Sequence, residues 1–494
     1  MSNHQEELSE HSALLPNVSL PSISSGIAKI NALGPDRLDM LYSETDVLRP
    51  QELSNHRTLQ TAYSLAVLLS LRAEYQKVSQ GTKGNSWDQW SAEKDATLAI
   101  NAIERNIKQV WTATLRECSK PQDIDTVLWM SIPAEEGKDN TVRVVDFLTH
   151  PTQAPTEVLS HRLIHLSLLD RWRRGPSLDF SRSRHYLTIR YDGLCTPRVV
   201  HAIELVIKIV FFVLLMSYTL HPPDMAIIYA EPLEAVGWRE GFLIFLSLAL
   251  SLSTFSLSNL PSYITFLAFF SALPSVPHPE NLSFSFLLLS VFVLLFQLHE
   301  PHAPSPLFLF PHERTLPFAV FLHQGLQKTV GNLLLFFLPI LLVSTFLLSS
   351  SLADTPFPPL FFQLATEPTP VETRTAYFLL SFMVLFVGAI SFFVTIPTVS
   401  FLPSPETSHW DRYSVTIGNI ARASFFREVV AYSQPYPFPS VFNVVRLILV
   451  RIPIIILDLF GVDHPFMEKF ERILWRVTVG PVVLLVTVLA IPLS

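Results

Sequence analysis

The residues that decide the fold class form two long apolar runs, 331-GNLLLFFLPILLVSTFLLSSSL-352 and 376-AYFLLSFMVLFVGAISFFVTIP-397. Each is close to the roughly 20 residues that carry an α-helix across the hydrocarbon core of a bilayer. Four more apolar runs precede them, after a long and mostly polar N-terminal part. The pattern predicts an all-α, polytopic membrane protein with six transmembrane helices. We expect them at 199–220, 240–257, 260–276, 282–298, 331–352 and 376–397.

The composition agrees with a membrane protein. Charged residues make up 16% of the 494 residues and hydrophobic residues 49%, whereas about a quarter of the residues of a soluble domain are charged. The net charge is −7 and no long basic stripe is present, so we expect no nucleic acid as a partner. Cys118 and Cys195 are the only cysteines and both precede the first apolar run, which implies no disulfide framework.

The histidines form no recognisable catalytic or metal-binding pattern. His161 and His165 lie four residues apart, the spacing of two ligands on one helical face, but no further ligand follows at a suitable spacing. More histidines crowd residues 299–323 without a repeated ligand motif or a glycine-rich phosphate loop. We therefore expect no metal site, no cofactor and no enzyme activity.

The segment between the two last runs, 354-DTPFPPLFFQLATEPTPVETRT-375, is too apolar and too rich in proline for an ordinary exposed loop. We interpret it as a pore loop, with a short helix after two prolines. A selectivity filter needs backbone carbonyls or a ring of carboxylates, and a ring with one glutamate from each subunit favours cations. The alternative is a solvent-facing loop with ordinary acids. The candidate pore residues are Asp354, Gln363, Thr366, Glu367 and Glu372.

Three small residues recur on nearly one face of the sixth predicted helix: Ser381, Gly388 and Ser391. Such a stripe either lines a pore or permits close packing of helices, and the spacing does not separate these alternatives. Gly388 is the natural bend point of this helix, because it is the only residue there without a side chain. Residues 301–330, which precede the fifth predicted helix, are expected to form an interfacial linker. Residues 331–398 are expected to form the pore module.

The N-terminal part predicts a disordered tail at 1–26 and a cytosolic helical domain at 27–198. Two amphipathic helices are expected in this domain, the second with Ser91 as its N-cap. Arginines precede the first transmembrane helix and predict a cytosolic N-terminus. The same arginines are candidates for binding membrane lipids, including phosphoinositides, although topology alone explains them about as well. They include Arg171, Arg173, Arg174, Arg182 and Arg184.

The region 399–494 contains two further apolar runs, which we expect to form a membrane-surface or re-entrant hairpin rather than two simple spans. Arg446 and Arg451 lie inside the first of them, where charge is costly in hydrocarbon. Glu204 and Lys208, four residues apart in the first helix (199–220), are expected to pair on a protein-facing side for the same reason.

This C-terminal region resembles the fungal vacuolar cation channels related to the transient receptor potential family. The resemblance rests on a proline-aromatic entry into an apolar helix at Pro437, Pro439, Phe442 and Asn443. An apolar stretch with a proline and then an aromatic, charged helix (466–493) follow in the same order. The resemblance implies a homotetramer that passes calcium, potassium and sodium ions from vacuole to cytosol, in response to stretch, cytosolic calcium or phosphoinositides.

Two functions follow as hypotheses. The first is a non-selective, calcium-permeable cation channel of an internal, vacuolar membrane, gated by stretch, lipid or a cytosolic signal. The second is a non-conducting membrane scaffold or regulator that kept the channel fold and lost the pore.

Overall fold

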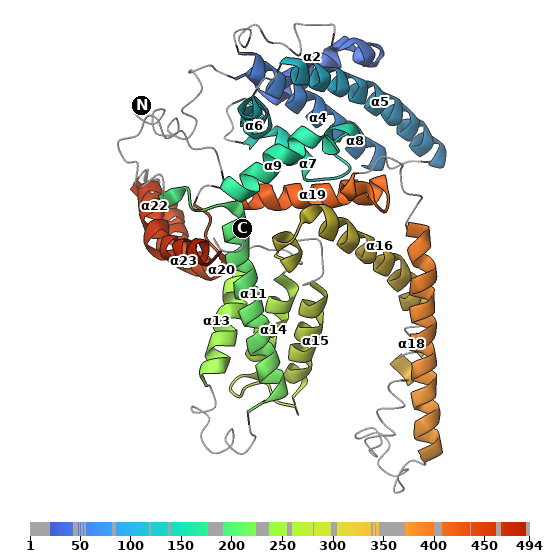
Figure 1. Ribbon diagram of the computed structural model, residues 1–494, viewed down its shortest axis with the longest axis vertical. Helices are drawn as coiled ribbons and strands as arrows, with labels where there is room; N and C mark the ends of the chain where they lie inside the picture. Colours follow the sequence, from blue (N-terminus) through green and yellow to red (C-terminus); the bar gives the residue numbers. More distant parts are fainter. Residues whose placement is uncertain are drawn as a thin grey trace. The chain divides into compact units, whose positions relative to one another are not determined.

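The computed structural model describes residues 20–42, 48, 50, 53, 56–81, 85–117, 120–136, 140–175, 191–223, 237–253, 259–279, 281–297, 304–336, 339–340, 342–344, 371–399, 408–434, 436–460 and 466–490. Two compact units divide the chain. One comprises residues 1–293 and 422–494, and the other residues 294–421. Almost all regular structure in the described residues is helical (Figure 1), as the composition and the apolar runs predicted.

A helical domain occupies the N-terminal part of the first unit, as expected. Its longest helices, α4 and α5, pack against each other, with Leu65, Leu68, Ile103 and Ile107 buried. The N-cap prediction was wrong, because α5 begins at Ser86 rather than after Ser91. Its elements are α2 (Ile23–Leu33), η2 (Pro35–Met40), α4 (Arg57–Gly81), α5 (Ser86–Glu117), α6 (Pro121–Trp129), β1 (Ile132–Pro133), β2 (Thr141–Val142), α7 (Val144–Leu148), α8 (Thr156–Leu159) and α9 (Arg162–Arg174).

The strands β1 and β2 form a small antiparallel hairpin, with Ile132 opposite Val142. The two strands lie between α6 and α7 in the chain, and the N–H of Ser24 on α2 donates to the carbonyl of Ala134 at 3.0 Å. The hairpin therefore ties the start of the domain to its middle without changing its helical class.

Four apolar helices follow in the first unit: α11 (Pro197–Leu220), α13 (Trp238–Ser253), α14 (Leu260–Ala272) and α15 (Leu282–Gln297). By length and composition, α11 is a candidate membrane span, and α14 and α15 are shorter apolar helices. Buried hydroxyls join the last two, because Thr265 and Ser290 share a hydrogen bond of 2.7 Å and Ser290 also donates to the carbonyl of Pro261. The helices stand where the sequence predicted them, and the six-span topology stays a prediction.

The C-terminal part contains α19 (Val415–Tyr432), α20 (Ser440–Arg446), the π turn η7 (Leu447–Arg451), α21 (Ile452–Leu459), α22 (Phe466–Thr478) and α23 (Gly480–Ala490). Pro453 has no N–H to donate to the carbonyl of Leu449, and the π turn stands at this point of the helix. Residues Ser440–Leu457 are a further candidate span. The first of the two apolar runs, which we expected to be part of a membrane-surface or re-entrant hairpin, is thus long and apolar enough to cross a bilayer.

The second unit is built mainly from two long helices, α16 (His312–Phe336) and α18 (Val371–Val399), which pack against each other. The short 3-10 turns η5 (Pro306–Leu309) and η6 (His409–Asp411) both contact α16. Helix α16 runs without interruption across residue 330, where the sequence suggested a boundary between linker and membrane helix. The third candidate membrane span, Val371–Ser391, lies in α18.

Candidate functional site

The small residues of α18 lie on its packed face. Ser381 and Gly388 are buried, whereas Ser391 is half-buried. The Ser381 hydroxyl donates to the Ser344 hydroxyl at 3.2 Å in a buried contact. Helix α18 thus packs closely through this stripe against the helical segment at 342–344, which is one of the two uses that the spacing of small residues allows.

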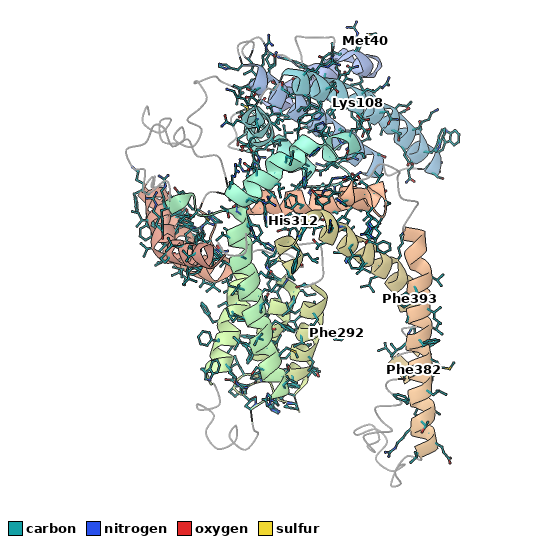
Figure 2. All side chains as sticks on the ribbon, in the orientation of Figure 1. Met40, Lys108, Phe292, His312, Phe382 and Phe393 are labelled. Atoms are coloured by element: carbon teal, nitrogen blue, oxygen red, sulfur yellow. The ribbon has the colours of Figure 1, made fainter. Side chains whose placement is uncertain are left out.

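The remaining surface of α18 is mostly exposed. Only 6% of its most apolar 18-residue window is buried, and large apolar side chains project from it in several directions, among them Phe382 and Phe393 (Figure 2). Soluble monomers rarely expose so large a contiguous apolar surface. A surface of this kind is typical of contact with lipid or with protein rather than water. The exposed residues include Phe378, Leu379, Phe382, Met383, Leu385, Phe386, Ile390, Phe393 and Val394.

Most of the candidate pore residues lie outside the described part of the chain. These are Asp354, Gln363, Thr366 and Glu367, so their role stays a prediction. Glu372 is described, and it is exposed in the first turn of α18. A carboxylate at this end of the helix interacts favourably with the helix dipole, and this requires no role in a pore.

The predicted lipid-binding arginines that the structure describes are of two kinds, one engaged inside the protein and two exposed. Arg171 is engaged inside the N-terminal domain, where it binds Asp125 at 3.2 Å and lies over the Trp129 ring at 3.7 Å. Burial raises the pKa of the Asp125 carboxyl and lowers the pKa of the Arg171 guanidinium. Arg173 and Arg174 are exposed at the end of α9. Arg182 and Arg184 lie outside the described residues.

An aromatic cluster joins α9, α11 and α19. The Trp172 ring lies 5.5 Å from the His201 ring and 5.9 Å from the Phe425 ring, and the Tyr432 ring lies 5.5 Å from His201. Trp172 and His201 are both buried. The cluster connects the N-terminal domain with the first apolar helix and with the helix that follows α18 in sequence. Sequence patterns did not indicate it, because its members come from three distant segments.

Helix α19 makes a second contact with the N-terminal domain, in which Arg427 donates to the carbonyl of Thr149 at 3.3 Å. Both residues belong to the first unit. The N-terminal domain and helix α19 are therefore held together by hydrogen bonding as well as by aromatic packing.

The C-terminal helices are attached to the start of α11 by polar contacts. Arg476 of α22 donates to both carboxylate oxygens of Asp192, at 2.6 and 3.0 Å, and the Tyr436 hydroxyl donates to the same carboxylate at 3.1 Å. The Glu204 carboxylate accepts from the N–H and the hydroxyl of Ser440, at 2.8 and 2.6 Å. Glu204 is therefore satisfied mainly by α20, with the buried Lys208 as a nearby opposite charge, rather than by Lys208 alone as expected.

Basic side chains gather around one cavity in the second unit. The cavity has a volume of about 290 Å³ and is lined by Arg314, His409, Arg412 and Tyr413. The Tyr413 ring stacks on Phe321 at 4.7 Å, which fixes this wall against α16. Among the described residues, no group of histidine, cysteine and acidic side chains has the arrangement of a metal site.

Comparisons with solved structures give similarity of low degree. No family model matches the sequence, and no curated protein matches it. A solved structure of PI3P- and calcium-bound full-length TRPY1 in detergent is similar over 92% of this chain and 89% of that chain, with 14% sequence identity and a TM-score of 0.48. Similarity at this level carries no argument about activity.

Proposed function

We propose that the protein is a non-selective, calcium-permeable cation channel of an internal, vacuolar membrane, assembled as a homotetramer. In this proposal the predicted fifth helix (331–352), α18 and the segment 354–374 of each subunit form the ion path, which also passes potassium and sodium. The N-terminal domain lies in the cytosol.

The observation that supports the proposal most strongly is the bare surface of α18. A large apolar side chain left in water forgoes about 1.5–3 kcal/mol relative to burial, and α18 exposes many of them. Helix α18 packs with α16 in a compact unit of its own. A pair of long helices with an uncovered apolar surface is suited to assembly with copies of itself around an axis, with lipid on the outside.

The charge of the segment 354–374 favours cations in such an assembly. Asp354, Glu367 and Glu372 carry the negative charge there, and rings of carboxylates select cations. In this proposal Glu367 contributes the ring and Gln363 and Thr366 add polar atoms beside it.

Exposed arginines support a regulatory contact with anionic lipid. Arg173 and Arg174 lie at the end of α9, and Arg182 and Arg184 follow within ten residues. Clusters of this kind beside a membrane helix attract phosphoinositide headgroups. Arg171 is excluded from this role in the proposal because Asp125 and Trp129 hold it inside the domain.

The test is a recording of current from purified protein in planar bilayers, with stretch and with phosphoinositide as stimuli. Glu367→Gln is expected to lower calcium permeability relative to potassium. Glu157→Gln is the matched control, because Glu157 is an exposed partner of Lys108 in the N-terminal domain. A protein that carries no current under either stimulus, or is monomeric or dimeric in detergent, would instead be the non-conducting scaffold.

A further inference from the structure

Helix α22 buries Met467 and Trp475 against the protein and also turns four large apolar residues outward. Its large exposed apolar residues are Phe466, Phe470, Ile473 and Val477, at spacings of four, three and four residues, which is one face of an α-helix. Phe466, Ile473 and Val477 are 59%, 57% and 68% exposed. We call these four residues the α22 stripe. A helix that faces water has the opposite arrangement, with its apolar stripe against the core.

Contacts on the inner side fix this orientation. Glu471 binds Arg446 at 2.5 Å, and Arg476 binds Asp192. Between them the buried indole of Trp475 donates to the carbonyl of Pro437 at 2.8 Å. Because three specific contacts hold the helix in this rotation, the outward direction of the α22 stripe is a feature of the fold.

Neighbouring helices add exposed apolar residues beside the α22 stripe. Helix α22 packs against α20, η7 and α23, and the first two belong to the candidate membrane span Ser440–Leu457. The exposed apolar residues on these neighbours include Ile448 and Leu449 before α22, and Leu484, Leu485 and Val488 after it. A surface of this extent is typical of contact with lipid or protein rather than water.

Cations favour lipid as the partner. Lys469 and Arg472 lie three residues apart, so they share one flank of the helix beside the α22 stripe. Long cationic side chains in this position place their charge among headgroups while their stems cover apolar surface. At 13 residues, α22 alone is about 20 Å long, shorter than a hydrocarbon core of about 30 Å.

We infer that α22 lies in the plane of the membrane interface, with the α22 stripe in the acyl-chain region of a phospholipid leaflet and its cationic flank among the phosphates. The leaflet is the one at which α11 begins. Arg476 binds Asp192, and the carbonyl of Arg476 accepts a hydrogen bond from the Tyr191 hydroxyl. Tyr191 and Asp192 lie only a few residues before Pro197, the first residue of α11. The attachment through Arg476 then holds the start of α11 at the depth of the headgroups.

The test measures the depth of single thiol labels in the full-length protein reconstituted into phosphatidylcholine vesicles. Cys118→Ser removes one native thiol. Cys195 can stay, because burial raises the pKa of its thiol to about 12 and leaves almost no thiolate for labelling near neutral pH. An environment-sensitive fluorophore is attached to Ile473→Cys or Val477→Cys on the α22 stripe, or to Lys469→Cys on the cationic flank as the matched control.

Lipid carrying a nitroxide near the headgroup end of its acyl chain is expected to quench the labels at 473 and 477 several times more strongly than the label at 469. Aqueous iodide is expected to give the reverse order. Iodide quenching at 473 and 477 as strong as at 469 would place the stripe in water and overturn the inference. Labels at 473 and 477 that neither quencher reaches would show that protein covers the stripe, which also overturns it. No ion current is needed, so the result is independent of the proposed channel activity.

Discussion

The substitution Asp192→Asn removes the negative charge that attaches α22 to the segment before α11. Asp192 accepts two hydrogen bonds from Arg476, at 2.6 and 3.0 Å, and one from Tyr436. Asparagine keeps the shape and one acceptor but loses the ion pair. The side chains of Asp192 and Arg476 are 16% and 30% exposed, so the pair is intermediate between a fully exposed and a fully buried ion pair.

Those limits set the expected magnitude. Exposed ion pairs contribute about 0–1 kcal/mol, and breaking a buried pair costs about 3–5 kcal/mol because one charge is left without its partner. A partly buried, bidentate pair should cost about 2 kcal/mol, and a change of this size is about 30-fold in an equilibrium constant. The equilibrium in question is the local detachment of α22 from its neighbours.

Hydrogen exchange of the full-length protein in nanodiscs, read by mass spectrometry, measures this detachment. Peptides from α22 are expected to exchange about 30-fold faster in Asp192→Asn than in the parent. The matched control is Asp170→Asn, which removes a pair with Arg174 whose side chains are 81% and 60% exposed, and it should leave α22 unchanged. The reasoning fails if α22 exchanges at the parental rate in Asp192→Asn, or if the control accelerates it equally.

Three further predictions follow from single positions. Gly480→Ala should weaken the contact between α23 and the segment before α11 by about 1–3 kcal/mol, because a Cβ at Gly480 would meet the Tyr191 ring at 2.6 Å. Faster hydrogen exchange of the α23 amides is the expected result, and an unchanged exchange rate would contradict it. Gly388→Ala should shift the open probability in single-channel recordings and leave the open-channel conductance nearly unchanged. The reason is that the substitution removes the roughly 1 kcal/mol helix penalty of glycine at a buried position. An unchanged open probability in a conducting channel would show that Gly388 has no role in gating. The raised Cys195 pKa of about 12 should slow alkylation at pH 8 by roughly a thousandfold relative to the unfolded chain. This thiol's contribution to stability is complete below its unfolded pKa of about 8.5 and is lost as the pH rises towards the folded value, and rapid alkylation of folded protein would refute both statements.

The sequence predicted those parts of the fold that depend on local transfer free energy. Helix α11 and the candidate span in α18 coincide with apolar runs, because the cost of placing each residue in lipid can be summed along the chain. The two amphipathic helices of the N-terminal domain were predicted from periodicity for the same reason. The start of α5 was missed because its first turns carry the exposed residues Trp87 and Trp90, which have no buried face and hence no period to detect.

The contacts that organise the candidate site were beyond local patterns. Glu204 was expected to pair with Lys208 because helical spacing brings them together, yet its hydrogen bonds come from Ser440, 236 residues away in the sequence. Arg171 stood among surface arginines in the sequence, and only the packing of α6 against α9 shows that Asp125 binds it. Partners of this kind are set by tertiary structure, and a single sequence contains no periodic signal for them.

The π turn between α20 and α21 gives one helix two directions of contact. An α-helix turns by about 100° for each residue, so the additional residue in the π turn rotates everything after Arg451 relative to everything before Leu447. The first half can hold Glu204 through Ser440 while the second half presents its isoleucines at a different angle. One helical stretch therefore binds α11 at its first end and exposes apolar side chains in a different direction at its second end.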